Sequence, residues 1–209
     1  MGSHLFNCFS REYNVCGYSL ENNYDISDEN ILEKIFADNK DCYAVINAAL
    51  SRSTLIPINQ MNSEFLQNYF KNNLISNFNI IKFSQKYLNN FRLIFFSSIA
   101  CLGMQNNSHY SAAKAALESL VKSASIELSN TLNRVYCIRL GAVEINKDKF
   151  SKELKIQHDK LQENLLKRTI GNKKISKEEI YGLVDYLLKN EQNSLHSEII
   201  PLSSGFGLF

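Results

Sequence analysis

Tyr110 and Lys114 stand four residues apart at the start of the alanine-rich stretch "HYSAAKAALESLVKSASIEL". On a helix this spacing puts two side chains on one face, so the lysine ammonium would stabilise the phenolate of the tyrosine. A free phenol, with a pKa near ~10, is a poor acid-base catalyst at neutral pH without such a neighbour. Chance alone supplies a pair with this spacing roughly once in a chain of this composition. The pair therefore gains meaning only from other residues that the fold brings to it.

Short apolar runs alternate with longer segments of helical periodicity along the chain. The runs lack strict alternation of apolar and polar residues, which predicts strands buried on both faces. Strand, helix, strand in succession predicts an α/β fold with a parallel sheet and helices on both faces. The predicted strands are residues 13–19, 42–48, 92–98, 134–140 and 197–203, and the predicted helices are residues 28–38, 63–88 and 177–189.

The ends of the predicted strands carry residues suited to ligand binding, which in such sheets takes place outside the carboxyl ends of the strands. Asn47-Ala48-Ala49 ends one strand with small residues that let a ligand approach the backbone. Ser97-Ser98 ends the next strand, and Gly141 ends the strand after it. Tyr110 follows Ser98 by a short connection, so the sequence predicts that a serine and the Tyr110 and Lys114 pair lie together.

These motifs, in this order, resemble the short-chain dehydrogenases/reductases, NAD(P)-dependent oxidoreductases built on a Rossmann-like sheet. "INAAL" resembles the N-A-G element of the family, "FKNNL" its mid-helix asparagine, "FFSSIA" its catalytic serine and "YSAAK" its tyrosine and lysine. "RLGAVEI" stands where the family has P-G-x-x-x-T, and "SEIIPLSSGFG" resembles its last strand. The resemblance covers nearly the whole chain, which we expect to be one domain.

The resemblance implies hydride transfer between a nicotinamide and a carbonyl or alcohol carbon, with four catalytic residues. Tyr110 would donate a proton to the developing alkoxide while the hydroxyl of Ser98 holds the same oxygen. Lys114 would also hold the nicotinamide ribose, and Asn73 would anchor a water that links Lys114 to a proton relay. Ser97, adjacent and on the opposite side of the strand, is the alternative serine.

The resemblance also implies the residues that hold the cofactor, NAD or NADP. Ser19 takes the place of the acidic residue that binds the ribose hydroxyls of NAD, so the preference leans towards NADP. The adenine would contact Asp25 and Ile26. The full set of expected cofactor-binding residues is Gly2, Ser19, Asp25, Ile26, Asn47, Ala48, Ala49, Tyr110, Lys114, Gly141 and Val143.

The amino-terminal end departs from the family, which opens with a strand and the glycine-rich turn T-G-x-x-x-G-x-G. "MGSHLFNCFSREYNV" resembles only the end of that turn and the helix after it, with Gly2 as the last glycine. We expect the first strand and most of the turn to be missing. A truncated gene product, a start codon assigned too late, a tag remnant and a paralogue that binds cofactor poorly all remain open explanations.

Composition excludes several other classes of protein. The net charge is +2 with both signs interspersed, which gives no basic footprint for nucleic acid or for an anionic membrane. Five widely spaced cysteines and the lack of a signal peptide or a long apolar run predict a cytoplasmic protein with reduced thiols. No cluster of His, Cys, Asp and Glu has metal-ligand spacing, so we expect no metal.

Two functions are compatible with these residues. The first is reduction of a small carbonyl compound, a 3-oxoacyl or sugar-derived ketone, or oxidation of the matching alcohol. The second is that of a cofactor-impaired paralogue with a structural role beside a partner subunit.

Residues 147–169 are either a lid over the substrate or a solvated surface helix, and His158 within them is expected to face solvent. By analogy with the family, a homodimer or homotetramer is expected through Ala112, Ala113, Ala115 and Ala116.

Overall fold

A parallel four-stranded sheet in the order β1-β2-β3-β4 is the centre of the computed structural model. The structure describes residues 1–50, 55–144, 152–189 and 199–206. The strands are β1 (Ala44–Asn47), β2 (Arg92–Ser98), β3 (Arg134–Leu140) and β4 (Ile199–Leu202). All neighbouring strands are parallel and successive along the chain, so a helical crossover connects each pair.

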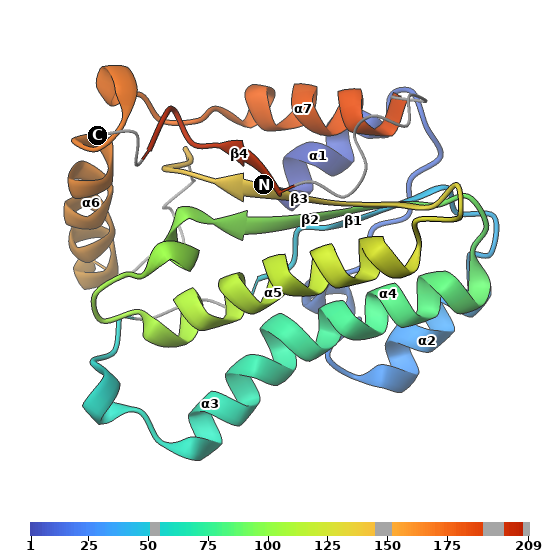
Figure 1. Ribbon diagram of the computed structural model, residues 1–209, viewed down its shortest axis with the longest axis horizontal. Helices are drawn as coiled ribbons and strands as arrows, with labels where there is room; N and C mark the ends of the chain where they lie inside the picture. The colour runs from blue at the N-terminus through green and yellow to red at the C-terminus, as the bar shows by residue number, and fades with distance from the viewer. Residues whose placement is uncertain (51–54, 145–151, 190–198, 207–209) are drawn as a thin grey trace.

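Helices cover both faces of this sheet (Figure 1). α1 and α7 lie on one face, and α2, α4 and α5 lie on the other. A π-helical turn at Lys71–Ile75 joins α3 to α4, and α6 stands beside the carboxyl ends of the strands (Figure 1). The helices are α1 (Gly2–Phe9), α2 (Glu29–Asp38), α3 (Ser63–Phe70), α4 (Ser76–Tyr87), α5 (Ser108–Glu127), α6 (Lys152–Leu166) and α7 (Lys177–Lys189).

The central strands are apolar on both faces because each face carries its own core. Leu93 and Phe95 of β2 pack with α2, α4 and α5. Ile94 and Phe96, which alternate with them, pack with α1 and α7. The continuous apolar runs at residues 92–98 and 134–140 therefore predicted β2 and β3 to the residue, and the α/β fold class is confirmed.

The predicted strand at residues 13–19 is wrong. This segment is not part of the sheet, and Tyr13, Asn14, Cys16 and Gly17 are exposed. Only Val15 packs against a core, so the segment buries too little apolar surface to be fixed as a strand. Within residues 1–50, all of them described, nothing pairs with the outer edge of β1. The carbonyl of Ala44 on β1 instead accepts a hydrogen bond from the thiol of Cys42 at 3.1 Å.

Candidate active site

Tyr110 and Lys114 lie on the first turns of α5, directly beside the end of β2. The Tyr110 hydroxyl shares a hydrogen bond with Ser98, the last residue of β2. The Lys114 Nζ lies 5.7 Å from the centre of the Tyr110 ring. The structure thus brings together three of the four residues that the sequence predicted as catalytic.

Ser98 rather than Ser97 faces the tyrosine, as strand alternation requires of two adjacent residues. The Ser98 hydroxyl also accepts the backbone N–H of Ala100 at 3.2 Å, which fixes its position at the strand end. Ser97 is buried on the side of α5 and donates to the backbone carbonyl of Lys114 at 3.4 Å. The two hydroxyls therefore have separate surroundings, one at the tyrosine and one inside the packed helix face.

Lys114 is a buried cation, with 7% of its surface exposed. Its Nζ donates a 2.7 Å hydrogen bond to the backbone carbonyl of Phe96. That carbonyl lies one residue beyond the part of β2 that pairs with β1. Removal from water disfavours the charged form and lowers the pKa of Lys114 to about 8.

Burial has the opposite effect on the tyrosine, because here the charged form is the phenolate. Desolvation raises the pKa of Tyr110, and the hydrogen bond from Ser98 offsets only part of the rise. Tyr110 is therefore protonated at neutral pH. The stabilisation of its phenolate by Lys114 stays a prediction, because the hydrogen bond of Lys114 goes to Phe96.

Asn73 lies in the π-helical turn that packs against α5. Its side chain is buried, and its amide nitrogen donates to the backbone carbonyl of Tyr69 at 3.0 Å. The backbone carbonyl of Asn73 accepts a hydrogen bond from Asn77 Nδ2 at 2.8 Å. Asn77 Oδ1 in turn accepts from Asn47 Nδ2 at 2.6 Å. Asn77, which the sequence analysis missed, therefore connects the turn of Asn73 to the carboxyl end of β1.

Other residues expected to hold the cofactor lie at neighbouring strand ends or against them. The Asn47 side chain accepts the backbone N–H of Ala49 at 3.1 Å. Gly2 begins α1 against β1, where a Cβ on Gly2 would lie 3.4 Å from the Cβ of Ala48. Val143, just beyond the end of β3, forms an isolated parallel bridge with Ile175.

The residues expected at the adenosine end are engaged in local structure. Ser19 does not end a strand; its N–H and hydroxyl donate to Asn22 Oδ1 at 2.6 and 3.1 Å. The Asp25 carboxylate accepts the N–H of Ser27 at 2.9 Å, and Ile26 packs against the core. All three residues are therefore held by contacts within the subunit, and their role at the adenosine stays a prediction.

A partly buried ion pair lies one helical turn beyond Lys114, and the sequence analysis missed it. Arg139 of β3 donates from Nε to Glu118 Oε1 at 2.8 Å and from a second nitrogen to Oε2. Burial alone would raise the pKa of Glu118, but hydrogen bonds from Arg139, Ser97 and Cys101 outweigh it and hold that pKa below its usual range. The pair joins α5 to β3, two residues before Gly141. A charged residue inside the apolar run "VYCIRL" was the signal that could have found it.

His109 fixes the start of α5 from the other side. Its ring lies 4.6 Å from that of Tyr69 and 5.2 Å from that of Phe65, both on α3 and both in edge contact. Desolvation lowers the pKa of His109, so the ring is neutral. Because His109 precedes Tyr110, these aromatic contacts hold the turn that carries the tyrosine.

Other kinds of site find no support in the part of the chain that the structure describes. No group of three or more His, Cys, Asp and Glu side chains there is arranged to hold a metal ion. Every helix within the described ranges is too short or too polar to cross a bilayer. Part of the predicted lid, residues 147–151, and the side chain of His158 lie outside the described residues.

Comparison with known proteins places these features in a family. The family model described as enoyl-(acyl carrier protein) reductase matches residues 16–207. Curated protein sequences give no match.

Solved structures with the same fold are numerous. A small-chain dehydrogenase in complex with NADPH is 18% identical, with a TM-score of 0.84, over 98% of this chain and 92% of that chain. A short-chain dehydrogenase/reductase from Brucella melitensis is 20% identical, with a TM-score of 0.72, over 87% and 72%. A short chain dehydrogenase from Burkholderia cenocepacia in complex with NADP is 14% identical, with a TM-score of 0.72, over 87% and 74%.

Breaking this ion pair is expected to cost stability. Arg139→Met leaves the buried Glu118 carboxylate without its cation, and we expect a loss of about 1–3 kcal/mol in the free energy of unfolding, less than for a fully buried pair because Arg139 is partly exposed. The double variant Glu118→Leu with Arg139→Met removes both charges and should recover most of that loss. Urea unfolding followed by circular dichroism measures both, with Lys122→Met, an exposed residue of α5, as the control. Equal losses in the single and double variants would contradict this account of the pair.

Gly141 is expected to tolerate no side chain. A Cβ there would lie 2.9 Å from the Ser203 Cα, a backbone atom that the hydrogen bond from Gly141 N–H to the Leu202 carbonyl holds close. Gly141→Ala should therefore lower the free energy of unfolding by about 1–3 kcal/mol. The matched control is Gly182→Ala in α7, where a Cβ meets nothing within 4 Å. This substitution should stabilise the helix by roughly 0.5–1 kcal/mol. Equal effects at the two glycines would refute the steric argument.

Proposed function

Since the chain belongs to the short-chain dehydrogenase/reductase family, we propose that it reduces a small carbonyl compound with NADPH or NADH, or oxidises the matching alcohol. Tyr110 is the proton donor in this proposal. The observation that carries it is the hydrogen bond between the hydroxyl of the half-buried Tyr110 and Ser98, with Lys114 on the next turn. The substrate class that we propose is a 3-oxoacyl or sugar-derived ketone.

Residues at the strand ends support a cofactor site. Gly2 meets Ala48 just beyond the end of β1, so two of the residues expected to hold the cofactor lie together. Asn47, Ala48 and Ala49 would hold the cofactor on one side, and Lys114, Gly141 and Val143 on the other. The bound nicotinamide supplies or accepts the hydride. We propose a weak preference for NADP over NAD, because Ser19 offers no carboxylate that would repel the ribose phosphate of NADP.

Protein groups perform the proton chemistry in this proposal. Ser98 turns its hydroxyl to the substrate oxygen and holds it against Tyr110. Tyr110 then gives its proton to that oxygen as negative charge develops, and its raised pKa keeps it in the protonated form that reduction needs. Lys114 stabilises the resulting phenolate. An ammonium has three N–H donors and Phe96 takes one of them, so the others remain for the ribose hydroxyls.

A second candidate function rests on the edge of the sheet. Within residues 1–50 the outer edge of β1 has no strand partner, and the residues expected at the adenosine end take part in local structure. A cofactor-impaired paralogue that acts beside a partner subunit would have these properties. The ability to bind a nicotinamide cofactor distinguishes the two functions.

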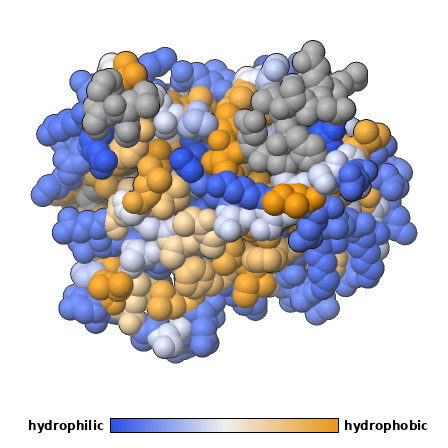
Figure 2. Space-filling model, viewed as in Figure 1, coloured by the Kyte–Doolittle hydropathy of each residue, from blue (hydrophilic) through white to orange (hydrophobic). Residues whose placement is uncertain are grey.

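The assembly that we propose is a homodimer or homotetramer formed through α4 and α5. Ala112, Ala115 and Ile126 are exposed on α5, and Phe78 is exposed on α4. Figure 2 shows apolar residues gathered over this part of the surface. Ala113, which the sequence analysis placed on the same face, is instead fully buried inside the subunit.

We further propose a cytoplasmic location, because all five cysteines are free thiols.

Removal of the Tyr110 hydroxyl tests the role of Tyr110 as proton donor separately from cofactor binding. Tyr110→Phe keeps the ring but lacks the proton, and it should lower kcat by about 10²–10⁴-fold with little change in NADPH affinity. Nicotinamide fluorescence measures the binding, and absorbance of NADPH measures turnover with a panel of 3-oxo esters and keto sugars. Tyr186→Phe on the exposed face of α7 is the control. If the wild-type protein binds neither NADPH nor NADH saturably at millimolar concentration, the partner-subunit function replaces this one.

The proposed interface predicts the mass in solution. The wild-type protein should elute at two or four times its 23.9 kDa chain mass when size-exclusion chromatography is coupled to light scattering. Ala115→Arg places a long charged side chain on the face of α5 that we propose to contact the second subunit. It should shift the mass to that of one chain. Ser129→Arg, exposed beyond the end of α5, should leave it unchanged. A monomeric wild-type protein would rule out the interface.

A further inference from the structure

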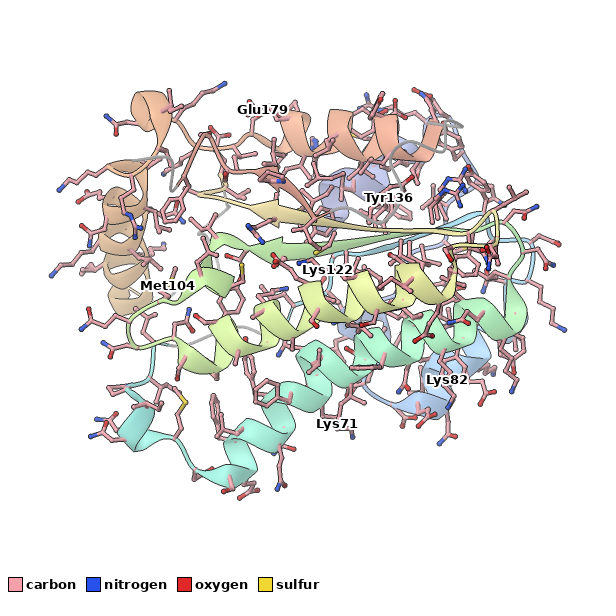
Figure 3. The ribbon with its side chains drawn as sticks, viewed as in Figure 1. Lys71, Lys82, Met104, Lys122, Tyr136 and Glu179 are labelled. Carbon is pink, nitrogen blue, oxygen red and sulfur yellow. The ribbon has the colours of Figure 1, made fainter. Side chains whose placement is uncertain are left out.

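A hollow of about 420 Å³ opens beside the connection between Ser98 and Tyr110. The residues of this connection, Ile99 and Gly103 to Asn106, line one wall of the hollow. Figure 3 shows Met104 on this wall, between the end of β2 and the start of α5. The opposite wall is α6, which stands at the carboxyl ends of the strands (Figure 1). The hollow therefore borders the connection between Ser98 and Tyr110, the two residues that we propose to hold the substrate oxygen, while their own side chains lie outside its lining.

One face of α6 lines the hollow, and its residues follow helical spacing. Lys160 and Asn164 are four residues apart on α6, with Leu161 and Leu165 beside them, and Arg168 lies in the turn that follows the helix end at Leu166. Glu163 falls between these positions and is not part of the lining. α6 and the turn after it thus present two cations, an amide and two leucines to the hollow.

The charges in the lining have one sign. Lys160 and Arg168 are its charged side chains, and Gln105, Asn106 and Asn164 are its amides. Among the described residues, neither cation forms a salt bridge with a carboxylate. Two unpaired cations facing one hollow attract an anion, and the amides add hydrogen-bond donors for its oxygens.

Arg168 is held in place for such contacts. Its guanidinium lies 4.4 Å from the centre of the Phe206 ring, a cation-π contact. The backbone on both sides of it is fixed, because Arg168 N–H donates to the Leu165 carbonyl at 3.0 Å and Ile170 N–H donates to the Ser204 carbonyl at 2.8 Å. A stacked guanidinium keeps its N–H edge available for carboxylate or phosphate oxygens.

We propose that this hollow binds an anionic group, a carboxylate or a phosphate, on the carbonyl substrate, with Lys160 and Arg168 as the residues that select it. The proposal rests on the proposed function and narrows its substrate to a 3-oxo acid or a phosphorylated keto sugar. Leu161, Leu165 and Ile99 pack against the carbon chain between the anionic group and the carbonyl. α6 then selects the substrate as well as covering it.

Matched pairs of substrates test the selection. Acetoacetate is compared with methyl acetoacetate, and dihydroxyacetone phosphate with dihydroxyacetone, because the members of each pair share a carbonyl and differ in charge. The wild-type protein should show a KM about 10-fold or more lower for one charged member than for its neutral partner. Arg168→Gln and Lys160→Gln should remove most of that difference by raising KM for the charged member, with kcat nearly unchanged. Lys167→Gln, exposed next to Arg168 but outside the lining, is the control.

Direct binding of small anions separates this proposal from the proposed function. Inorganic phosphate and acetate are titrated into the wild-type protein without cofactor, and calorimetry records the heat. We expect saturable binding of one of them in the millimolar range, weakened about 10-fold by Arg168→Gln. Binding of phosphate indicates a phosphorylated substrate, and binding of acetate indicates a substrate with a carboxylate. If neither anion binds, or if Arg168→Gln and Lys167→Gln weaken binding equally, the anion site is overturned whether or not NADPH binds.

Discussion

The hydrogen bond from the buried Lys114 ammonium to the Phe96 carbonyl is the interaction on which the candidate site depends. A cation removed from water is costly unless its donors are satisfied, and one hydrogen bond of 2.7 Å supplies part of this compensation. The acceptor is available because β2 extends past the end of β1, so the Phe96 carbonyl lies beyond the paired region. The relative lengths of two neighbouring strands thus determine where a lysine from α5 can be buried.

Several contacts around that bond fix α5 against the strand ends. The Glu118 and Arg139 pair joins the helix to β3, Ser97 reaches the backbone of Lys114, and His109 joins the first turn to α3. Each contact lies within about two helical turns of Tyr110. Tyr110 and Ser98 meet because the helix is held on three sides, and this preorganisation is what positioned proton transfer requires.

The sequence predicted the parts of the fold whose signal is local. β2 and β3 are apolar on both faces, and this pattern fixed their bounds. Residues 13–19 had similar composition but lie outside the sheet, because a strand needs a neighbour and a core that local composition does not reveal. The meeting of Ser98, Tyr110 and Lys114 was predictable from strand ends and helical spacing. Asn77, Glu118 and Arg139 were not found, because their partners lie on other elements and only packing brings them together.

The measurement that tests the account most directly is the titration of Lys114 itself. Protein with 13C-labelled lysine ε-carbons is followed by NMR from pH 6 to 11, and Lys114→Arg identifies the resonance. Burial predicts a pKa of about 8 for Lys114, well below the value near ~10.4 expected of solvated lysines. A Lys114 resonance that titrates together with the exposed lysines would show that the ammonium lies in water, and the buried cation beside Tyr110 would then not exist.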